Sequence, residues 1–475
     1  MGHQRKIFRF SRQILTGGTE CRPIVFVCWS RKIHVECRKA MALSTQPVKG
    51  ARDFYPEDMR LQKYIFAVWR DACERFGYEE YDAPILEPTE LYLSKGNEEI
   101  IQEQTYTFTD RGDRSVTLRT EMTPTVSRMV AARRQQLAYP LRWYSIPQCW
   151  RYERMQRGRG REFYQLNVDI FGVDGLAADC EMIEVADRIM QAFGAKQAMY
   201  TIKINSRKLM DYLLAEVLGF DPTQAETVRR LIDRMAKIDY PAFVGQLDGI
   251  CSPSQREAGT GERLLSFLKT QSLADIADDL NVTPFTTELT RLMDMLAKSG
   301  VSNVVFDPTL MRGFDYYTDI AFEVFDNHPD NNRSMFGGGR YADLVSLFGV
   351  EPVSSVGFGM GDITLRNFLE SHGLLPQLTT EADVYVILVG NVLEQSQMPI
   401  RELRGMGLNV VVDNTDRKTD KQIKSAVKKG IRYALFIGSK ELEDEQFTLK
   451  DLQTGVSETH GLQRVVSVIK DFRKA

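Results

Sequence analysis

The sequence predicts an α+β fold in which a strand-rich region carries a helical insertion and is followed by a small α/β domain. Residues 106–171 include four strand-like segments, two of which alternate apolar and polar side chains with the period of two of a strand. Most of residues 206–298 has instead the apolar spacing and mixed charge of helices. Residues 381–475 alternate strand-like and helix-like stretches, a βαβ rhythm that predicts a separate domain.

The elements of the first half follow in order. Apolar residues recur every three or four positions over 57–76, which predicts an amphipathic helix that Gly77 ends. A strand over 78–85, interrupted by Pro84, is expected next. Further strands are expected at 106–110, 115–123, 141–153 and 162–173, and a helix at 177–193.

The second half returns to strands after the insertion, at 301–306 and 318–325. Gly337, Gly338 and Gly339 predict a turn before another helix, and a linker at 376–380 precedes the last domain. We therefore expect a separate N-terminal segment over 1–46, a domain over 47–375 with its insertion at about 206–298, and a domain over 381–475.

The composition is that of a globular protein, with 43% hydrophobic and 26% charged residues in 475. No apolar run approaches the ~20 residues of a membrane-spanning helix, so we expect no membrane partner. The seven Cys include no CxxC pair, which argues against structural zinc and redox chemistry. With only five His, we expect no histidine-based metal site and no Ser-His-Asp triad. The chemistry is therefore expected to depend on Arg, Glu and Tyr.

Residues 1–40 hold nine Lys or Arg and two Glu, whereas the rest of the chain is net acidic. A basic, acid-poor start with scattered apolar residues predicts an organelle transit peptide, mitochondrial or chloroplast. The alternatives are a secretory signal with its apolar stretch at Pro23–Trp29, and a basic tail without structure. Met41 opens a second plausible start, from which the protein would be cytoplasmic.

Polar side chains share one face of two predicted strands. At 162–173, Gln165, Asn167 and Asp169 project from one face and apolar residues from the other. At 115–123, the alternation places Glu121 and Thr123 together. A carboxylate with Thr and Gln nearby would bind a substrate ammonium well, whereas the alternative interpretation is a solvent-exposed sheet face.

Arginines crowd the loop between two of these strands. Five occur within eleven residues: Arg151, Arg154, Arg157, Arg159 and Arg161. Because the planar guanidinium suits phosphate, the loop predicts a nucleotide or RNA clamp, with a solvated charge run as the alternative. The glycine-rich stretches 337–340 and 357–361 lack the sequence context of phosphate-binding and dinucleotide-binding loops. Their glycines are expected to let a backbone approach a ligand or another strand closely.

Five stretches resemble histidyl-tRNA synthetases, in a match that runs from about residue 48 to the C-terminus. They read GARDFYPEDMR (50–60), TLRTEMTP (117–124), WRYERMQRGRGREFYQLNVDIFG (150–172), LMRGFDYYT (310–318) and FGGGRYADLV (336–345). The resemblance implies a class II synthetase fold, an antiparallel sheet with flanking helices in a homodimer, followed by an anticodon-binding domain. It implies L-histidine, histidine tRNA and ATP with Mg²⁺, no organic cofactor, and no metal held by protein ligands alone.

The resemblance also implies roles for individual residues. Arg312, Arg151 and Gln165 would be the catalytic residues. Histidine would be bound by Glu121, Met122, Thr123, Arg151, Gln165, Asp169, Arg312, Tyr316 and Tyr317. ATP would be bound by Arg151, Glu153, Arg159, Phe163 and Arg312. The tRNA would be bound by Arg154, Arg157, Arg161, Lys418 and Lys421.

The implied reaction activates histidine with ATP to histidyl-adenylate and pyrophosphate, then transfers histidine to the 3′ end of its tRNA. Because a carboxylate is already ionised at neutral pH, alignment and charge stabilisation suffice for its attack. One position departs from the family: Thr364 stands where an Arg for the γ-phosphate is expected, with Arg366 as a candidate substitute. The alternatives are a non-catalytic relative, either a regulatory subunit of histidine biosynthesis or a kinase sensing module, and a class II synthetase of other specificity.

Overall fold

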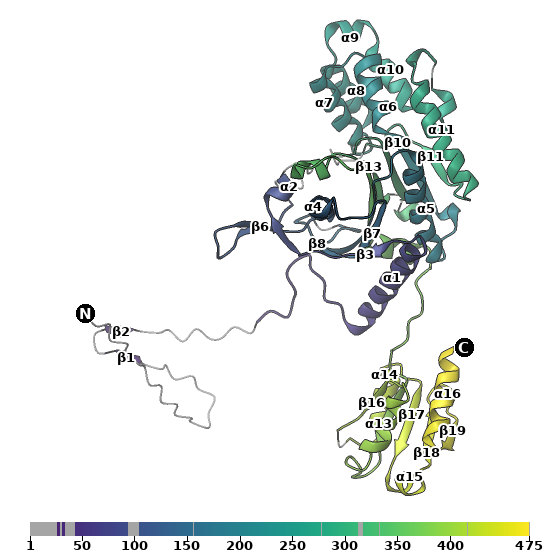
Figure 1. Cartoon of the computed structure of the whole chain (residues 1–475). Coiled ribbons are helices and arrows are strands. Elements are labelled where there is room, and N and C mark those ends of the chain that lie inside the picture. Colours follow the sequence, from purple (N-terminus) through teal and green to yellow (C-terminus); the bar gives the residue numbers. More distant parts are fainter. Residues whose placement is uncertain are drawn as a thin grey trace. The chain divides into compact units, whose positions relative to one another are not determined.

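The computed structural model describes residues 26–28, 31–33, 43–93, 104–154, 156–276, 278–311, 317–331, 333–415 and 417–474 (Figure 1). The chain divides into two compact units, residues 1–48 and 49–475. In the first unit, β1 (Phe26–Cys28) and β2 (Arg31–Ile33) form an antiparallel pair. Most of the predicted transit peptide lies outside the described residues.

A nine-stranded sheet organises the larger unit, in the order β11-β10-β12-β13-β14-β9-β7-β3, with β8 paired to β9. Its strands are β3 (Glu79–Glu80), β7 (Leu141–Ser145), β8 (Gln148–Trp150), β9 (Glu162–Phe171), β10 (Tyr200–Ser206), β11 (Val304–Phe306), β12 (Ile320–Asp326), β13 (Ser334–Tyr341) and β14 (Ser355–Gly361). The pairs β10–β11 and β3–β7 are parallel, and the other pairs of this sheet are antiparallel. The predicted α+β class, an antiparallel sheet with flanking helices, is confirmed.

Two long helices cover the apolar face of β9. They are α1 (Pro56–Arg75) and α5 (Leu176–Ala192), and α12 (Asp362–Ser371) follows β14. In α1, Pro56 in the first turn and a glycine just past the end match the predicted helix. Ile65 and Trp69 of this helix are buried with Leu166 of β9 in the main hydrophobic core. The opposite face of β9 is thereby left for polar side chains.

Three predictions for this region were wrong. Of the strand expected at 78–85, only β3 forms. The next strand, β4 (Leu86–Pro88), belongs to a small sheet with β5 (Thr107–Thr109) and β6 (Ser115–Leu118). The strand expected at 115–123 ends at Leu118, because helix α4 (Thr123–Arg133) begins with Pro124 in its first turn. The glycines expected in a turn lie inside β13, paired with β12 and β14. The remaining elements are α2 (Glu90–Leu93), η1 (Gln197–Met199), η6 (Pro329–Asn331) and η7 (Val345–Phe348).

Residues 207–298 are mostly helical (Figure 1). Their buried apolar side chains belong to the same hydrophobic cluster as those of the large sheet. The helices are α6 (Arg207–Tyr212), η2 (Leu213–Val217), α7 (Pro222–Asp233), η3 (Met235–Lys237), α8 (Tyr240–Ile250), α9 (Pro253–Glu257), α10 (Thr260–Leu268), η4 (Leu273–Asp275), η5 (Asp278–Leu280) and α11 (Thr283–Lys298). Capping is local and explicit: Asp221 accepts from the backbone of α7, and the Gln224 side chain closes the capping box.

The last region forms a five-stranded sheet, in the order β16-β15-β17-β18-β19. Its elements are β15 (Val384–Leu388), α13 (Gln397–Gly405), β16 (Val410–Val412), α14 (Thr419–Lys428), β17 (Tyr433–Ile437), α15 (Ser439–Asp444), β18 (Phe447–Asp451), β19 (Ser457–His460) and α16 (Leu462–Lys474). Strand β15 pairs in parallel with β16 and β17, as the βαβ rhythm predicted. Across the described residues, no helix combines the length and the apolar character that crossing a membrane requires.

Candidate active site

A cavity lies on the polar face of β9. Strands β9, β13 and β14 and the start of α4 supply its walls. The lining residues are Glu121, Thr123, Gln165, Asn167, Tyr317, Gly337, Tyr341, Gly357, Phe358 and Gly359. The polar face predicted for β9 therefore faces a cavity and is not a solvent-exposed sheet face.

The glycines of β14 make room for the side chains of β9. A Cβ on Gly357 would lie 2.1 Å from Asp169 Oδ1, and one on Gly359 would lie 2.6 Å from Gln165 Nε2. Both distances are far below van der Waals contact, so these positions exclude any larger residue while the neighbours stay in place. The prediction that these glycines allow close approach to another strand is confirmed.

Asp169 is a buried carboxylate at this site, with 3% of its surface exposed. The Tyr341 hydroxyl donates a hydrogen bond to Asp169 Oδ1. Burial raises the pKa of Asp169 to about 7, and the hydrogen bond from Tyr341 opposes that shift. Near neutral pH this carboxyl therefore exchanges a proton easily and can act as a hydrogen-bond acceptor or donor.

Gln165 presents an acceptor at the cavity. Its Oε1 atom is buried and receives no hydrogen bond from the described residues. A buried acceptor without a donor is costly, which indicates that a ligand donor belongs there. Glu121 and Thr123 line the same cavity, although the predicted shared strand face is wrong. The turn after β6 and the first residue of α4 bring them to the cavity instead.

A second group of predicted residues meets at the base of the hairpin of residues 151–161. Arg151 Nε donates to Thr120 O at 3.0 Å, and its Cζ lies 5.4 Å from the centre of the Phe163 ring. Glu153 lies between two arginines, with Oε1 at 3.9 Å from Arg151 Nη1 and Oε2 at 3.3 Å from Arg159 Nη1. The structure thus brings together an aromatic face, a carboxylate and two guanidiniums, a set suited to a nucleotide.

The other arginines of the hairpin have different surroundings. Arg154 is exposed. Arg161 packs on the ring of Tyr152, with its Cζ 3.7 Å from the ring centre, and donates to Glu153 O at 3.3 Å. Its aliphatic carbons also lie against Gly50, where a Cβ would approach them to 2.6 Å. Arg161 therefore holds the hairpin in place, whatever else it contacts.

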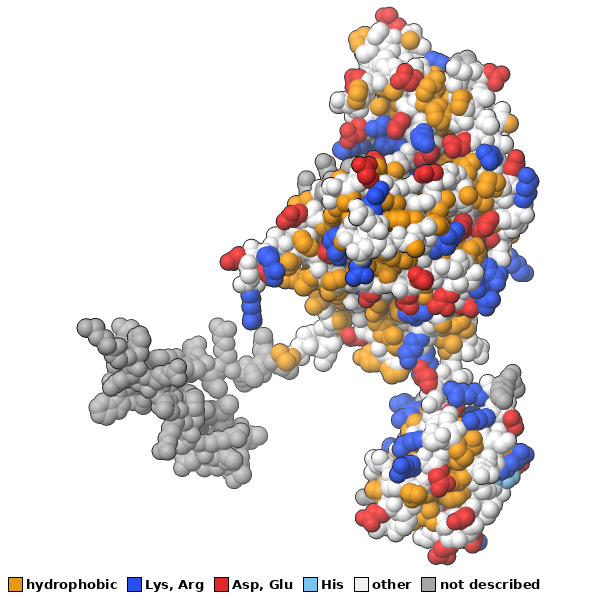
Figure 2. Space-filling model, viewed as in Figure 1, with side chains coloured by type: hydrophobic (Ala, Val, Ile, Leu, Met, Phe, Trp, Pro, Cys, Tyr) orange, Lys and Arg blue, Asp and Glu red, His pale blue; other side chains and the backbone are white. Residues whose placement is uncertain are grey.

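The predicted basic residues of the last region, Lys418 and Lys421, are exposed at the start of α14. Figure 2 shows Lys and Arg side chains interspersed with acidic ones over the visible face of this region. The mixture of signs means that any attraction to a polyanion is local to such groups.

The candidate substitute Arg366 does not carry a free charge. Its Nε lies 2.9 Å from Glu370 Oε1, and its Nη1 lies 3.6 Å from Asp58 Oδ1. Thr364 Oγ1 donates to Met335 O at 3.0 Å. The charge of Arg366 is therefore already compensated, and Thr364 carries no charge.

Several site residues were either undescribed or missed by sequence reasoning. Arg312 and Tyr316 lie outside the described residues, whereas Tyr317 lines the cavity. Met122 is fully buried and is not among the lining residues. Sequence reasoning placed Asn167 on the polar face of β9 without assigning it a ligand, and it did not single out Tyr341. The alternation of β9 already indicated Asn167, whereas no local signal indicates that Tyr341 reaches Asp169.

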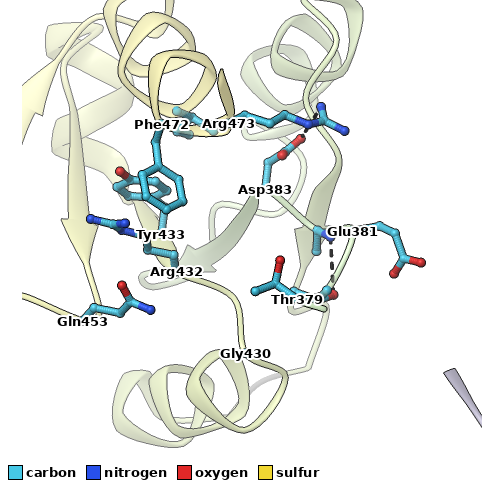
Figure 3. A pocket seen from close by; sticks show the side chains of 12 residues that line it. Thr379, Glu381, Asp383, Gly430, Arg432, Tyr433, Gln453, Phe472 and Arg473 are labelled. Carbon is cyan, nitrogen blue, oxygen red and sulfur yellow. Dashed lines mark hydrogen bonds and ion pairs between the residues drawn. The ribbon is translucent and has the colours of Figure 1, made fainter. Parts of the chain in front are cut away.

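A second cavity lies in the last region, beside the end of α16 (Figure 3). Arg432 donates to Asp451 Oδ2 at 2.9 and 2.7 Å and stacks 3.7 Å from the centre of the Phe472 ring. Across the cavity, Arg473 Nη1 lies 3.5 Å from Asp383 Oδ2. These charged groups already have partners, so the cavity offers less to a charged ligand than the first one does.

Comparisons with known proteins identify the family that the chain resembles. The histidyl-tRNA synthetase family matches residues 50–362, and an anticodon binding domain matches residues 383–472. A histidine–tRNA ligase of Leptospira biflexa is 39% identical over 440 residues, which cover 91% of this chain and 99% of the relative. The histidine–tRNA ligase of Thermoplasma volcanium is 38% identical over 418 residues, 88% of this chain and 96% of the relative.

Solved structures give the same likeness. A histidyl-tRNA synthetase from Nostoc sp. aligns with a TM-score of 0.75 at 25% identity, covering 90% of this chain and 99% of that one. A structure from Bacillus halodurans, titled as an ATP phosphoribosyltransferase regulatory subunit/histidyl-tRNA synthetase, aligns with a TM-score of 0.69 at 24% identity. The second covers 84% of this chain and supports the fold alone.

Proposed function

This chain belongs to the histidyl-tRNA synthetase family, and from that premise we propose how its residues divide the work of the reaction. The protein is an ATP-dependent histidine–tRNA ligase with a class II catalytic domain and an anticodon-binding domain. Its substrates are histidine, ATP and tRNA. The proposal below assigns these substrates to the atoms described above.

We place histidine in the cavity of β9, β13 and β14. Its ammonium is held by Glu121, Thr123 and the buried Oε1 of Gln165, which receives no donor from the described residues. Its imidazole faces Asp169 and Tyr317. An imidazole N–H can donate to the Asp169 carboxylate, which Tyr341 orients with its own hydrogen bond. The observation that carries this assignment is the paired acceptors Gln165 and Asp169 on one strand face, each in close contact with a glycine of β14.

We place ATP at the base of the hairpin, with its adenine near Phe163 and Glu153 and its α-phosphate at Arg151. In the first step a carboxylate oxygen of histidine forms a bond to the α-phosphorus while the bond to the pyrophosphate oxygen breaks. The products are histidyl-adenylate and pyrophosphate, and no proton moves. Arg151, with Arg312, stabilises charge on the phosphoryl oxygens and aligns the two reactants.

In the second step, a hydroxyl of the terminal ribose of tRNA attacks the carbonyl carbon of the adenylate. The ester bond forms, AMP leaves, and the hydroxyl proton is released. We propose that Arg154, Arg157 and Arg161 lie near the acceptor end and that Lys418 and Lys421 contact the tRNA backbone. These side chains supply attraction to phosphate, which salt weakens.

Mg²⁺ is proposed to accompany ATP, with phosphate oxygens as its main ligands. Among the described residues no group of three or more His, Cys, Asp or Glu side chains could hold a metal ion. When bound, the ion neutralises phosphate charge and favours departure of pyrophosphate.

Residues 1–46 are further proposed to form an organelle transit peptide, mitochondrial or chloroplast, with a cytoplasmic product if Met41 is the start. We also propose a homodimer.

The function is tested by amino-acid-dependent exchange of pyrophosphate into ATP, with the full chain and each of the twenty amino acids. We expect exchange with histidine alone. The Gln165→Ala variant should lower kcat/KM for histidine about tenfold or more, because an ammonium loses a charged hydrogen bond. Binding of histidine without exchange would instead indicate a non-catalytic relative.

A further inference from the structure

Two arginines meet at the tip of the hairpin without a carboxylate partner. Arg333 Nη1 donates a hydrogen bond of 2.8 Å to the backbone carbonyl of Arg157. Arg157 in turn donates to Asp330 O and Ser371 Oγ, both at 3.4 Å. These neutral acceptors satisfy donors but leave both positive charges uncompensated. No ion pair within the described part of the chain includes either arginine.

Other arginines around α12 are neutralised. Arg52 Nη2 lies 2.9 Å from Asp362 Oδ2, at the start of α12. Arg366, one turn further along, is paired with Glu370. An anion at the start of this helix therefore finds free positive charge at the tip of the hairpin and not at Arg52 or Arg366.

The tip lies against the first turn of α12. Thr364 Cγ2 and Arg333 Nη1 lie 3.5 and 3.7 Å from one point, the position that a Cβ on Gly158 would occupy. Gly158 has a φ of +83°, a conformation that disfavours any side chain there. Because Thr364 already donates its hydroxyl to Met335 O, it offers neither a charge nor a free donor to a phosphate. Arg333, the residue just before β13, thus brings a cation to the neighbourhood of Thr364 in α12.

We propose that Arg333, with Arg157 beside it, binds the terminal phosphates of ATP and replaces the arginine that Thr364 cannot provide. The proposal rests on the proposed ATP site, in which Arg151 at the base of the hairpin takes the α-phosphate. The β- and γ-phosphates then extend toward the tip. A polyphosphate at the tip would meet two positively charged side chains whose described partners are all neutral, so no carboxylate offsets the attraction. The planar fork of Arg333 also suits bidentate contact with phosphate oxygens.

The test uses Arg333→Ala in the full chain and three readouts. We expect the KM values for ATP and for pyrophosphate in the exchange reaction to rise about tenfold to a hundredfold, because a charged hydrogen bond is lost. Transfer of histidine from preformed histidyl-adenylate to tRNA should stay within about twofold of the wild type. Arg333→Lys should retain part of the affinity, and it separates loss of charge from loss of folding. Arg366→Ala, whose charge is already paired, is the matched control and should leave both KM values unchanged.

A second-site variant sharpens the test. Thr364→Arg added to Arg333→Ala should restore most of the affinity for ATP and pyrophosphate, because it returns a guanidinium to the same neighbourhood. Unchanged KM values for ATP and pyrophosphate in Arg333→Ala would overturn the inference. A rise confined to the KM for tRNA would also overturn it and would indicate that the arginine binds RNA. Absence of exchange in the wild type would instead refute the proposed function itself, so the two failures are distinguishable.

Discussion

Several polar side chains at the cavity of β9, β13 and β14 are buried, whereas several charged side chains of the hairpin of residues 151–161 are exposed to solvent. Asn167 lines the cavity and is 4% exposed, and Asp169, which contacts the lining residues Tyr341 and Gly357, is 3% exposed. In the hairpin, Arg159 is 57% exposed. A buried group that loses its partner is costly, whereas an exposed charge attracts many anions and is screened by salt. Under the proposed assignment of substrates, selectivity for the amino acid is built into the sheet, and attraction for phosphate into the hairpin.

The largest expected effect comes from breaking the cavity with Gly357→Ala. The new Cβ would lie 2.1 Å from Asp169 Oδ1 and 2.8 Å from Val168 O, so β14 and β9 cannot keep their positions. We expect loss of detectable histidine-dependent pyrophosphate exchange and a lower Tm, with an overpacking cost of about 1–3 kcal/mol. Gly245→Ala, which meets nothing within 4 Å, is the control. Near-normal exchange by Gly357→Ala would contradict the proposed geometry.

A smaller effect is expected from Asp169→Asn, which keeps the shape and removes the charge. The kcat/KM for histidine should fall about tenfold to a hundredfold, since the imidazole loses a charged acceptor in a buried site. The KM for ATP should change little, because ATP is placed at the hairpin. Equal losses for both substrates would show that the cavity and the hairpin are not separate sites.

The same carboxyl predicts a pH dependence of stability. Its pKa in the folded protein, about 7, lies above its ordinary value because burial disfavours the charged form. The stability that the protonated carboxyl contributes is therefore fully present below about pH 4 and is lost as the pH rises through about 7. Relative to Asp169→Asn, the wild type should lose roughly 1–4 kcal/mol of unfolding free energy over that window. Urea titrations of both proteins at several pH values check this, and parallel pH profiles would refute it.

The smallest expected effect is a difference in kinetics between alanine variants of two arginines of the hairpin. Arg161→Ala removes the packing on Tyr152 and the hydrogen bond to Glu153 O, so the hairpin loosens. We expect the KM values for both ATP and tRNA to rise about fivefold, the loss of roughly 1 kcal/mol. Arg154→Ala, at an exposed position, should raise only the KM for tRNA and weaken its salt dependence. Steady-state kinetics at two salt concentrations distinguish these outcomes, and identical effects of the two variants would contradict the difference.

Sequence reasoning identified most residues of the cavity, although only one of its two strand-face arguments was correct. The alternation of β9 correctly placed Gln165, Asn167 and Asp169 on one face, because the period of two is a local property of a strand. For Glu121 and Thr123 the same argument was wrong. Their segment leaves the strand at Leu118 and enters a helix, although both still line the cavity. Pro124 in the first turn of α4 was the available signal for that helix.

The role of Arg161 shows where a local pattern is insufficient. Five arginines in eleven residues look alike in the sequence, and all were expected to face phosphate. In the structure, Arg154 is exposed, Arg159 pairs with Glu153 and Arg161 supports the hairpin. Composition therefore predicts the sign of the charge on a surface. The residues that fold against the loop decide which of its charges remain without a partner.

The sequence by itself determined the α+β class, the polar face of β9 and the resemblance to one synthetase family. These follow from spacing along a single segment, where neighbouring side chains have directions set by the backbone. Tertiary structure alone decided that Tyr341 reaches Asp169, 172 positions earlier, and that Arg333 reaches Arg157, 176 positions earlier. Such contacts depend on which strands pair and in which register, and pairing is determined by the packing of the whole sheet.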